Sequence, residues 1–269
     1  MHLNNNERID DLEYKDLKII QRKDGFCFGI DSVLLSNYAK DIKRGTVGLD
    51  LGTGTGILGI LLCGKTDLSK IYGIEVQQEV AEMAQRSIKL NNLENRFEII
   101  NKNIKDLESV FDKNSFDFII TNPPYKKMDT GKTNENSKKL ISRHEITATL
   151  KDFIKISYIM LKDKGTLYMV HKPERLVDII YQLRKNKIEP KEIRFVHPYE
   201  KKEPNLILIK AVKNGGQFLK IDKPLYVYNE RGEYTEVISF TIDKIYDEKG
   251  NILEKACHPE EILKIYNKR

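Results

Sequence analysis

Cysteine is scarce in this sequence, and the few cysteines lie far apart. The 269 residues include only Cys27, Cys63 and Cys257, and no CxxC pair occurs. Disulfide frameworks and cysteine-based zinc sites require more cysteines at closer spacing. The sequence therefore predicts neither a disulfide framework nor a metal site, and a reducing compartment suits it best.

Long hydrophobic runs and a strong charge of one sign are missing as well. The longest apolar run, near residues 57–62, is far shorter than the ~20 residues that cross a bilayer. Residues 1–11 are polar and acidic, unlike a signal peptide. The 46 basic and 40 acidic residues give a net charge of +6, which permits a polyanionic partner without requiring one. We therefore expect a cytoplasmic protein without a membrane segment.

The chain does contain a regular alternation of strand-like and helix-like segments. Hydrophobic residues make up 40% and charged residues 32% of it, as in soluble globular proteins. Strands are expected at 47–51, 70–74, 97–100, 116–120, 166–170, 193–196 and 206–212, and helices from 57 onward and at 79–90, 150–161 and 173–185. This order predicts an α/β fold, a Rossmann-like, mostly parallel seven-stranded sheet with helices on both faces. It divides the chain into an N-terminal extension (1–45), a core domain (46–216) and a C-terminal extension (217–269).

A glycine-rich turn follows the first strand. Asp50 lies at the end of the strand, and the turn carries Gly52, Thr53, Gly54 and Gly56. Glycines let the backbone bend sharply and approach a ligand, and ligands of doubly wound folds bind beyond the carboxyl ends of the strands. The G-x-G-x-G spacing differs from the G-x-G-x-x-G of dinucleotide sites, and a carboxylate here suits an ammonium better than a phosphate. The turn therefore predicts S-adenosylmethionine as the cofactor.

Two polar residues after the next strands extend this candidate cofactor site. Glu75 ends the second strand, where a carboxylate can accept hydrogen bonds from both hydroxyls of a ribose. Asn103 follows the third strand, where its amide would meet the adenine amino group. The alternative is that Asp50 and Glu75 are surface charges at strand ends and that Asn103 is an ordinary loop asparagine.

The fourth strand ends in Asn122, Pro123, Pro124 and Tyr125. A planar aromatic amine is a poor nucleophile because its lone pair is delocalised into the ring. The Asn122 side-chain oxygen and the Pro123 carbonyl can each accept a hydrogen bond from such an amine, which orients its lone pair toward a methyl donor. Two prolines stiffen the turn, and Tyr125 offers a ring on which a base can stack. Asn-Pro alone is also a common turn signal, so the prediction depends on the cofactor site upstream.

The tetrapeptide behind a glycine turn resembles the class I amino-methyltransferases, which include adenine-N6 and glutamine-N5 enzymes. Four further segments together resemble the bacterial tRNA1(Val) adenine-N6 methyltransferase family, namely Gly25–Ser32, Arg143–Ile146, His171–Arg175 and Arg194–Pro198. That family is similar to a stand-alone methyltransferase small domain and modifies the adenosine 3′ of the anticodon. The resemblance covers residues 7–216 and, weakly, 226–234. Several families share the tetrapeptide, whereas the joint occurrence of the four segments is much more specific.

The resemblance implies roles for residues outside the two motifs. Phe28, Gly29 and Asp31 would form a lid near the methionine end of the cofactor, and Asn122 would also contact the cofactor. The implied substrate-binding residues are Arg143, His144, His171, Arg175, Arg194 and His197. The alternatives are that Phe28 is an ordinary core residue and that the histidines are structural.

Two segments carry a surplus of positive charge. Residues 126–139 hold five lysines and two acids, and residues 172–194 hold seven basic and four acidic residues, a surplus of +3 in each. Phosphate contacts of this kind dominate nucleic-acid affinity, which favours RNA, and tRNA in particular, as the partner. A solvated lysine-rich face is the commoner origin of such runs.

The chain departs from the family pattern in two places. The family usually has an acid where Asn103 stands, so here an amide would take the place of a carboxylate at the adenine contact. About two dozen residues, 237–259, precede a short final helix expected at 261–266. A β-hairpin insertion is the simplest interpretation of this extra segment.

Four other functions fit the sequence less well than RNA methylation. A glutamine-N5 methyltransferase normally has a helical N-terminal substrate domain, for which residues 1–45 are too few. A DNA adenine methyltransferase needs a base-reading region, and the sequence offers none of sufficient length. A non-catalytic RNA-binding module has no need of an amine-orienting Asn122. An oxidoreductase would require the dinucleotide spacing.

Overall fold

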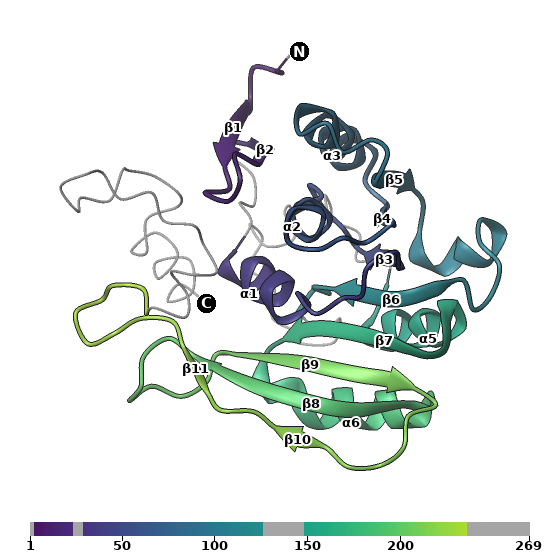
Figure 1. Ribbon diagram of the computed structural model, residues 1–269, viewed down its shortest axis with the longest axis vertical. Helices are drawn as coiled ribbons and strands as arrows, with labels where there is room; N and C mark the ends of the chain where they lie inside the picture. The colour runs from purple at the N-terminus through teal and green to yellow at the C-terminus, as the bar shows by residue number, and fades with distance from the viewer. Residues whose placement is uncertain (1–2, 24–28, 126–147, 236–269) are drawn as a thin grey trace, which may run out of the picture.

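The computed structural model describes residues 3–23, 29–125 and 148–235. Its centre is one twisted sheet with strand order β10-β8-β9-β7-β6-β3-β4-β5 (Figure 1). The long strands are β3 (Val47–Leu51), β4 (Lys70–Glu75), β5 (Phe97–Asn101), β6 (Phe116–Thr121), β7 (Leu161–His171), β8 (Ile188–His197) and β9 (Leu206–Lys213). Neighbouring strands pair in parallel from β5 to β7, and β9 is antiparallel to both β7 and β8. The predicted mostly parallel α/β sheet is confirmed.

Two short strands add to the seven that were predicted. β10 (Lys220–Ile221) and β11 (Leu225–Tyr226) belong to the C-terminal extension, and both pair in parallel with β8. The described sheet therefore has nine strands rather than seven. A strand of two residues is too short to show an alternating pattern, and its backbone hydrogen bonds come from β8 rather than from its own sequence.

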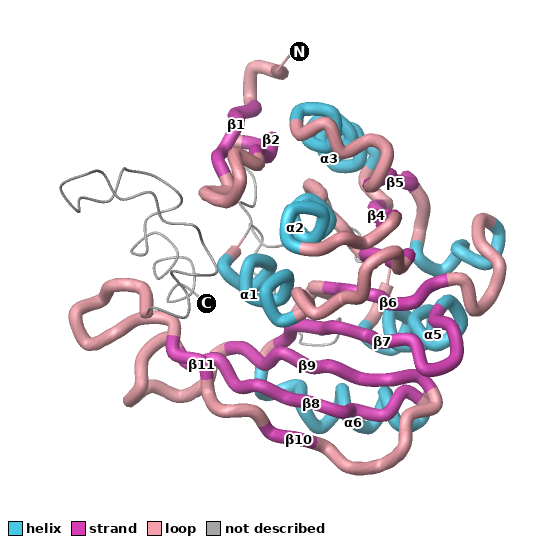
Figure 2. The backbone as a smooth tube through the Cα atoms, viewed as in Figure 1, coloured by secondary structure: helices cyan, strands magenta, loops and turns pink. Residues whose placement is uncertain are grey.

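Helices cover both faces of the sheet (Figure 2). One face carries α1 (Ile30–Tyr38), α2 (Ile57–Lys65) and α3 (Gln78–Leu90), and the other carries η1 (Ile104–Ser109), α5 (Leu150–Met160), η2 (Pro173–Arg175) and α6 (Leu176–Lys185). The helix predicted at 173–185 is thus divided into a 3₁₀ turn and an α-helix. Helix α5 starts with a capping box, in which Thr149 and Asp152 each bond the backbone N–H of the other.

The N-terminal extension contributes both a hairpin and a core helix. β1 (Glu7–Asp11) and β2 (Lys18–Arg22) pair antiparallel, and the two terminal guanidinium nitrogens of Arg86 in α3 donate to Glu7 at 2.6 Å. The Arg86 hydrogen bonds are the main reason that the pKa of the Glu7 carboxyl falls to about 2. Leu35 of α1 is fully buried in the same core as α2. These contacts join residues 3–23 and 29–45 to the core domain.

The parallel strands bring the predicted site residues to one edge of the sheet. β3, β4, β6 and β7 all point the same way, so their carboxyl ends lie side by side. Asp50, Glu75, Asn122 and His171 occur at or just beyond these ends. This is the edge at which doubly wound folds bind their ligands.

Candidate functional site

The glycine turn after β3 has the backbone that its sequence predicts. Gly52, Gly54 and Gly56 have φ angles of 71°, 57° and 88°, in the left-handed region that side chains disfavour. Thr53, between the first two, donates its backbone N–H to the Ile74 carbonyl at 2.9 Å. A Cβ placed on Gly54 would meet no atom within 4 Å. The turn is therefore held by β4 on one side and open at Gly54 on the other.

Asp50 is fully buried beneath this turn. The Thr53 hydroxyl donates to its Oδ2 at 2.6 Å, whereas Oδ1 has no hydrogen-bond partner in the described part of the chain. Burial raises the pKa of the Asp50 carboxyl to about 7, the nearby charge of Glu75 raises it further, and the Thr53 hydrogen bond opposes the rise. A buried acceptor without a donor is costly, and a ligand ammonium at Oδ1 would remove that cost.

Glu75 connects the end of β4 to the glycine turn. Its Oε2 accepts from the Gly54 backbone N–H at 3.1 Å and its Oε1 from that of Gln77 at 2.9 Å. The Gln77 side-chain amide also donates to Oε1, at 3.3 Å. A carboxylate oxygen has two lone-pair positions, so Oε2 is the oxygen that retains capacity for a further donor such as a ribose hydroxyl. The side chain is nearly buried, and its direction is fixed by backbone groups.

Asn103 has a structural role that the sequence did not reveal. It is the residue before η1, and its side-chain oxygen accepts the Lys105 backbone N–H at 3.0 Å. Its amide oxygen is thus engaged as a helix cap, which leaves the amide nitrogen as the group to meet a nucleobase. A contact between Asn103 and the cofactor stays a prediction.

A second group of side chains lies around Asn122, and we call it the Asn122 corner. It consists of Asp31, Ser32, Asn122, Tyr125 and His171. The Tyr125 hydroxyl is 2.8 Å from Asn122 Oδ1 and 2.8 Å from Asp31 Oδ2, and Asn122 Nδ2 donates to the Ser32 hydroxyl at 3.4 Å. Segments some ninety residues apart in sequence thus meet at the end of β6. Of the two prolines, Pro123 is buried and Pro124 is exposed.

His171 forms the far side of this corner. It ends β7 and is fully buried, with its ring centroid 5.0 Å from that of Tyr125. Its Nδ1 accepts the Lys172 backbone N–H at 2.8 Å, and its Nε2 has no partner among the described residues. Burial lowers the pKa of the His171 imidazole to about 4, and the Arg175 charge lowers it further. The ring is therefore neutral at physiological pH.

Other predicted substrate residues make local contacts in this structure. Arg175 forms an ion pair with Asp178, with 2.9 Å between Nε and Oδ2. Arg194 donates to the Lys223 carbonyl at 3.1 Å, and His197 bonds the Lys202 carbonyl at 2.7 Å. Gly29 precedes the first residue of α1. Phe28, Arg143 and His144 lie outside the described residues, as do the lysines of 126–139, the insertion at 237–259 and the expected helix at 261–266.

Ser32 and Lys172 belong to the site but were not singled out from the sequence. Ser32 contacts Asn122, and the Lys172 ammonium lies 5.5 Å from the centre of the Tyr125 ring. Both residues fall within segments that resemble the tRNA1(Val) methyltransferase family, Ser32 beside Asp31 and Lys172 beside His171. The resemblance could therefore have indicated them.

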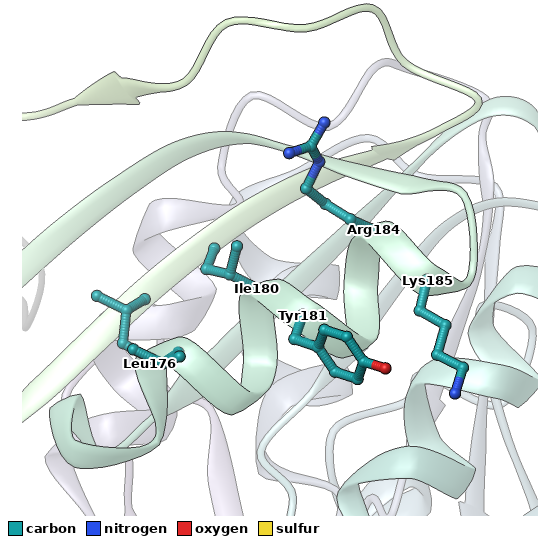
Figure 3. Close-up of a pocket in the computed structure, with 6 residues that line it drawn as sticks. Leu176, Ile180, Tyr181, Arg184 and Lys185 are labelled. Carbon is teal, nitrogen blue, oxygen red and sulfur yellow. The ribbon is translucent and has the colours of Figure 1, made fainter.

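A shallow groove elsewhere on the molecule does not coincide with this site. It runs along the outer side of α6 (Figure 3) and is lined by Leu176, Val177, Ile180, Tyr181, Arg184 and Lys185. No residue predicted to bind cofactor or to catalyse is among them. In the described ranges, no helix is long and apolar enough to cross a membrane. The same ranges hold no group of three or more His, Cys, Asp or Glu side chains arranged to bind a metal.

Solved structures with a similar fold include a predicted methyltransferase and a protein solved in complex with AdoMet. A predicted O-methyltransferase from Agrobacterium tumefaciens superposes with a TM-score of 0.65 at 20% identity, covering 79% of this chain and 95% of that one. TYW2 from M. jannaschii, solved in complex with AdoMet, gives a TM-score of 0.53 at 16% identity over 79% of this chain and 88% of that one. At these identities the likeness establishes the fold alone.

Curated relatives are more informative about the family. A tRNA1(Val) (adenine(37)-N6)-methyltransferase from Porphyromonas gingivalis is 28% identical over 204 residues, 74% of this chain and 79% of the relative. A protein of the same name from Shewanella baltica is 23% identical over 235 residues, 87% of this chain and 97% of the relative. These relatives confirm the resemblance predicted from the sequence.

A family model described as the methyltransferase small domain matches residues 28–183. This segment is more than half of the 269 residues. It includes both the glycine turn and the Asn122 tetrapeptide. The chain therefore belongs to the methyltransferase small domain family.

Proposed function

We propose that this protein transfers a methyl group from S-adenosylmethionine to the N6 amine of an adenine in tRNA, at the adenosine 3′ of the anticodon. The observation that carries the proposal is the position of Asn122 relative to Asp50. Asn122 directly follows β6, and Asp50 lies on β3, the strand paired with β6. A site for a methyl donor and an acceptor for an amine thus stand on adjacent strands. The substrate is the one named for the relatives in Porphyromonas gingivalis and Shewanella baltica.

The residues of the turn fit the cofactor. Asp50 Oδ1, buried and without a partner in the described chain, is an acceptor for the ammonium of the methionine portion. Glu75 Oε2 retains a lone pair for a ribose hydroxyl, and Gly54 leaves room where a side chain would project. When bound, S-adenosylmethionine supplies an electrophilic methyl group on a sulfonium centre.

The protein's own contribution on the acceptor side is orientation. The Asn122 oxygen and the Pro123 carbonyl accept the two N–H bonds of the amine, which turns its lone pair toward the cofactor. Fixed acceptors of this kind act by positioning and by electrostatic stabilisation of the charge that develops on nitrogen. Tyr125 supplies an aromatic face for the base, a contact worth ~1–3 kcal/mol.

A tRNA substrate also accounts for the charge near the site. Lys172 and Arg175 lie next to His171 at the strand-end edge, where phosphates on either side of the target nucleotide would pass. Because tRNA is cytoplasmic, we assign the activity to that compartment. The described N-terminal extension consists of a hairpin and one helix, which differs from the helical substrate domain of the glutamine-N5 enzymes.

The proposal is tested by methyl transfer from labelled S-adenosylmethionine to total tRNA that lacks this modification. The tRNA is digested, and the labelled nucleoside is identified by chromatography and mass spectrometry. N6-methyladenosine formed by the wild type and absent with Asn122→Ala would support both chemistry and substrate class. A protein that binds S-adenosylmethionine but labels only ribosomal RNA or a protein amide would contradict the tRNA assignment. A protein that binds RNA and transfers no methyl group would contradict catalysis.

A further inference from the structure

Tyr125 occupies the position that the proposed reaction reserves for the target base. Its hydroxyl oxygen lies 2.8 Å from Asn122 Oδ1, the acceptor for the amine. Its ring lies against His171, with the two centroids 5.0 Å apart. A hydroxyl attached to an aromatic ring therefore stands where an amine attached to a purine would stand.

The Tyr125 side chain has to move away from Asn122 before a base can bind there. The hydroxyl has one hydrogen, which it can donate fully either to Asn122 or to Asp31 Oδ2. In both cases its oxygen blocks the approach of an amine nitrogen to Asn122 Oδ1. When the ring withdraws to stack on the base, the side of His171 that it covered faces the base instead.

His171 then presents a hydrogen-bond donor. Because Nδ1 accepts the Lys172 backbone N–H and the ring is neutral, the proton of the imidazole is on Nε2. That N–H is buried and has no partner among the described residues. A buried donor left without an acceptor is destabilising, and a base in the place of the Tyr125 ring would bring an acceptor to it.

We propose that His171 is a specificity-determining residue, whose Nε2–H donates to a ring nitrogen that flanks the target amine. The inference rests on the proposed adenine-N6 reaction. In adenine, both N1 and N7 are acceptors beside the amine, on its two sides. Guanine has a carbonyl in place of this amine and a hydrogen on N1, so at these positions it offers neither the amine to Asn122 nor an N1 acceptor to His171. The residue thus selects a base in which a ring-nitrogen acceptor flanks the amine, while Asn122 holds the amine itself.

The test uses the full-length protein and tRNA carrying a single target nucleoside, installed by ligation of synthetic RNA. The target is adenosine, 1-deazaadenosine or 7-deazaadenosine. The first analogue lacks the N1 acceptor, and the second lacks the N7 acceptor. For the wild type and for His171→Phe, kcat/KM is measured on all three. A deaza substitution also alters the reactivity of the amine itself. The informative quantity is therefore the loss of kcat/KM that each analogue causes in the wild type, divided by the loss it causes in His171→Phe.

One analogue should lower kcat/KM about tenfold more in the wild type than in His171→Phe, the size expected for one buried hydrogen bond. His171→Gln, which keeps a side-chain N–H, should restore part of that discrimination. Equal effects of both analogues in the wild type and in His171→Phe would overturn the proposal. So would a wild type that methylates adenosine and both analogues equally well, and this outcome requires no variant to fold.

Failure of this inference is distinguishable from failure of the proposed function. If the wild type forms no N6-methyladenosine on the unmodified target, the function itself is wrong. If it does so and His171 shows no coupling to either ring nitrogen, only the role of His171 is wrong. Calorimetric titration with S-adenosylmethionine shows that each variant retains a folded cofactor site.

Discussion

Asp50 and Asn122 end neighbouring strands, yet the surroundings of their acceptor oxygens differ. Around Asp50, the Thr53 hydroxyl and the turn backbone fix the geometry, and Oδ1 is left without a partner in the described chain. Around Asn122, the acceptor oxygen is already contacted by the Tyr125 hydroxyl at 2.8 Å. The cofactor side is therefore preformed, whereas the substrate side is closed by one of its own residues.

This difference indicates an order of events. A preformed site binds its ligand without rearrangement, and so pays little conformational cost. A site closed by Tyr125 binds only after a hydrogen bond is exchanged, which lowers the apparent affinity for the substrate. We expect the cofactor to bind the free protein readily and the RNA to bind with a measurable penalty. Substitutions that alter the cofactor site or the substrate site alone can separate these two expectations.

The largest effect is expected from Asn122→Ala. Loss of the amine acceptor should lower kcat about 10²–10³-fold, as for other fixed electrostatic groups. Affinity for S-adenosylmethionine should change less than about threefold, since Asp50 and Glu75 are untouched. Single-turnover methyl transfer and calorimetry measure the two quantities. The exposed Asn95→Ala is the matched control, and an equal loss of cofactor affinity in Asn122→Ala would remove the distinction between the two sides.

Glu75→Ala should have the opposite pattern. Losing hydrogen bonds between a carboxylate and ribose hydroxyls should weaken cofactor binding about 10–100-fold, while kcat at saturating cofactor stays within a few-fold. Glu79→Ala removes an equally charged side chain that is 85% exposed and serves as the control. Calorimetry that finds unchanged affinity in Glu75→Ala would contradict its ribose role. Glu75→Gln, which keeps an acceptor for the Gly54 N–H, separates cofactor contact from turn stability.

The Asp50 carboxyl should make cofactor binding depend on pH. Because its pKa in the free protein is raised to about 7, the charged form that suits an ammonium declines as pH falls below 7. Affinity should therefore drop about tenfold for each pH unit below that value. Asp50→Asn should bind weakly at every pH, without this slope. A wild-type affinity that is flat between pH 5.5 and 8 would contradict the assignment.

The same raised pKa gives a stability signature of opposite sign. Between the ordinary pKa near 3.8 and about 7, the folded protein binds a proton that the unfolded chain does not. The stability contribution of the protonated carboxyl is thus lost as pH rises through 7. In the absence of cofactor, Asp50→Asn should melt at a higher temperature than the wild type above pH 7, and this advantage should shrink at lower pH. The exposed Asp67→Asn should show no such trend.

Much of this edge was predictable because its signals are local. β-branched runs mark the strands, glycines mark positions of positive φ, and Asn-Pro-Pro-Tyr marks the end of β6. Each signal depends on a few consecutive residues, and the parallel sheet then brings them together. The orientation of Glu75 toward the glycine turn follows from the same logic, since β3 and β4 are paired.

The contacts that close the site were not predictable in this way. Tyr125 meets Asp31, and Asn122 meets Ser32, across ninety or more positions of sequence. No periodic pattern encodes such a pair, and the same holds for the hydrogen bond that joins the β1–β2 hairpin at Glu7 to Arg86 of α3. Asn103 differs in that its contact is local. Its side-chain oxygen accepts the Lys105 backbone N–H at the start of η1, although a functional interpretation would assign that oxygen to the cofactor.

The smallest expected effect tests whether Tyr125 closes the substrate side. Tyr125→Phe keeps the aromatic ring for stacking and removes the hydroxyl that contacts Asn122 Oδ1 and Asp31 Oδ2. A hydrogen bond to a neutral amide oxygen such as Asn122 Oδ1 contributes about 0.5–1.5 kcal/mol, so the loss of this bond should lower KM for tRNA roughly two- to tenfold, with kcat nearly unchanged. Tyr125→Ala, which also loses the stacking ring, should instead raise KM. If Tyr125→Phe raises KM as much as Tyr125→Ala does, the hydroxyl assists substrate binding rather than opposing it. The substrate site around Asn122 is then as preformed as the cofactor site around Asp50.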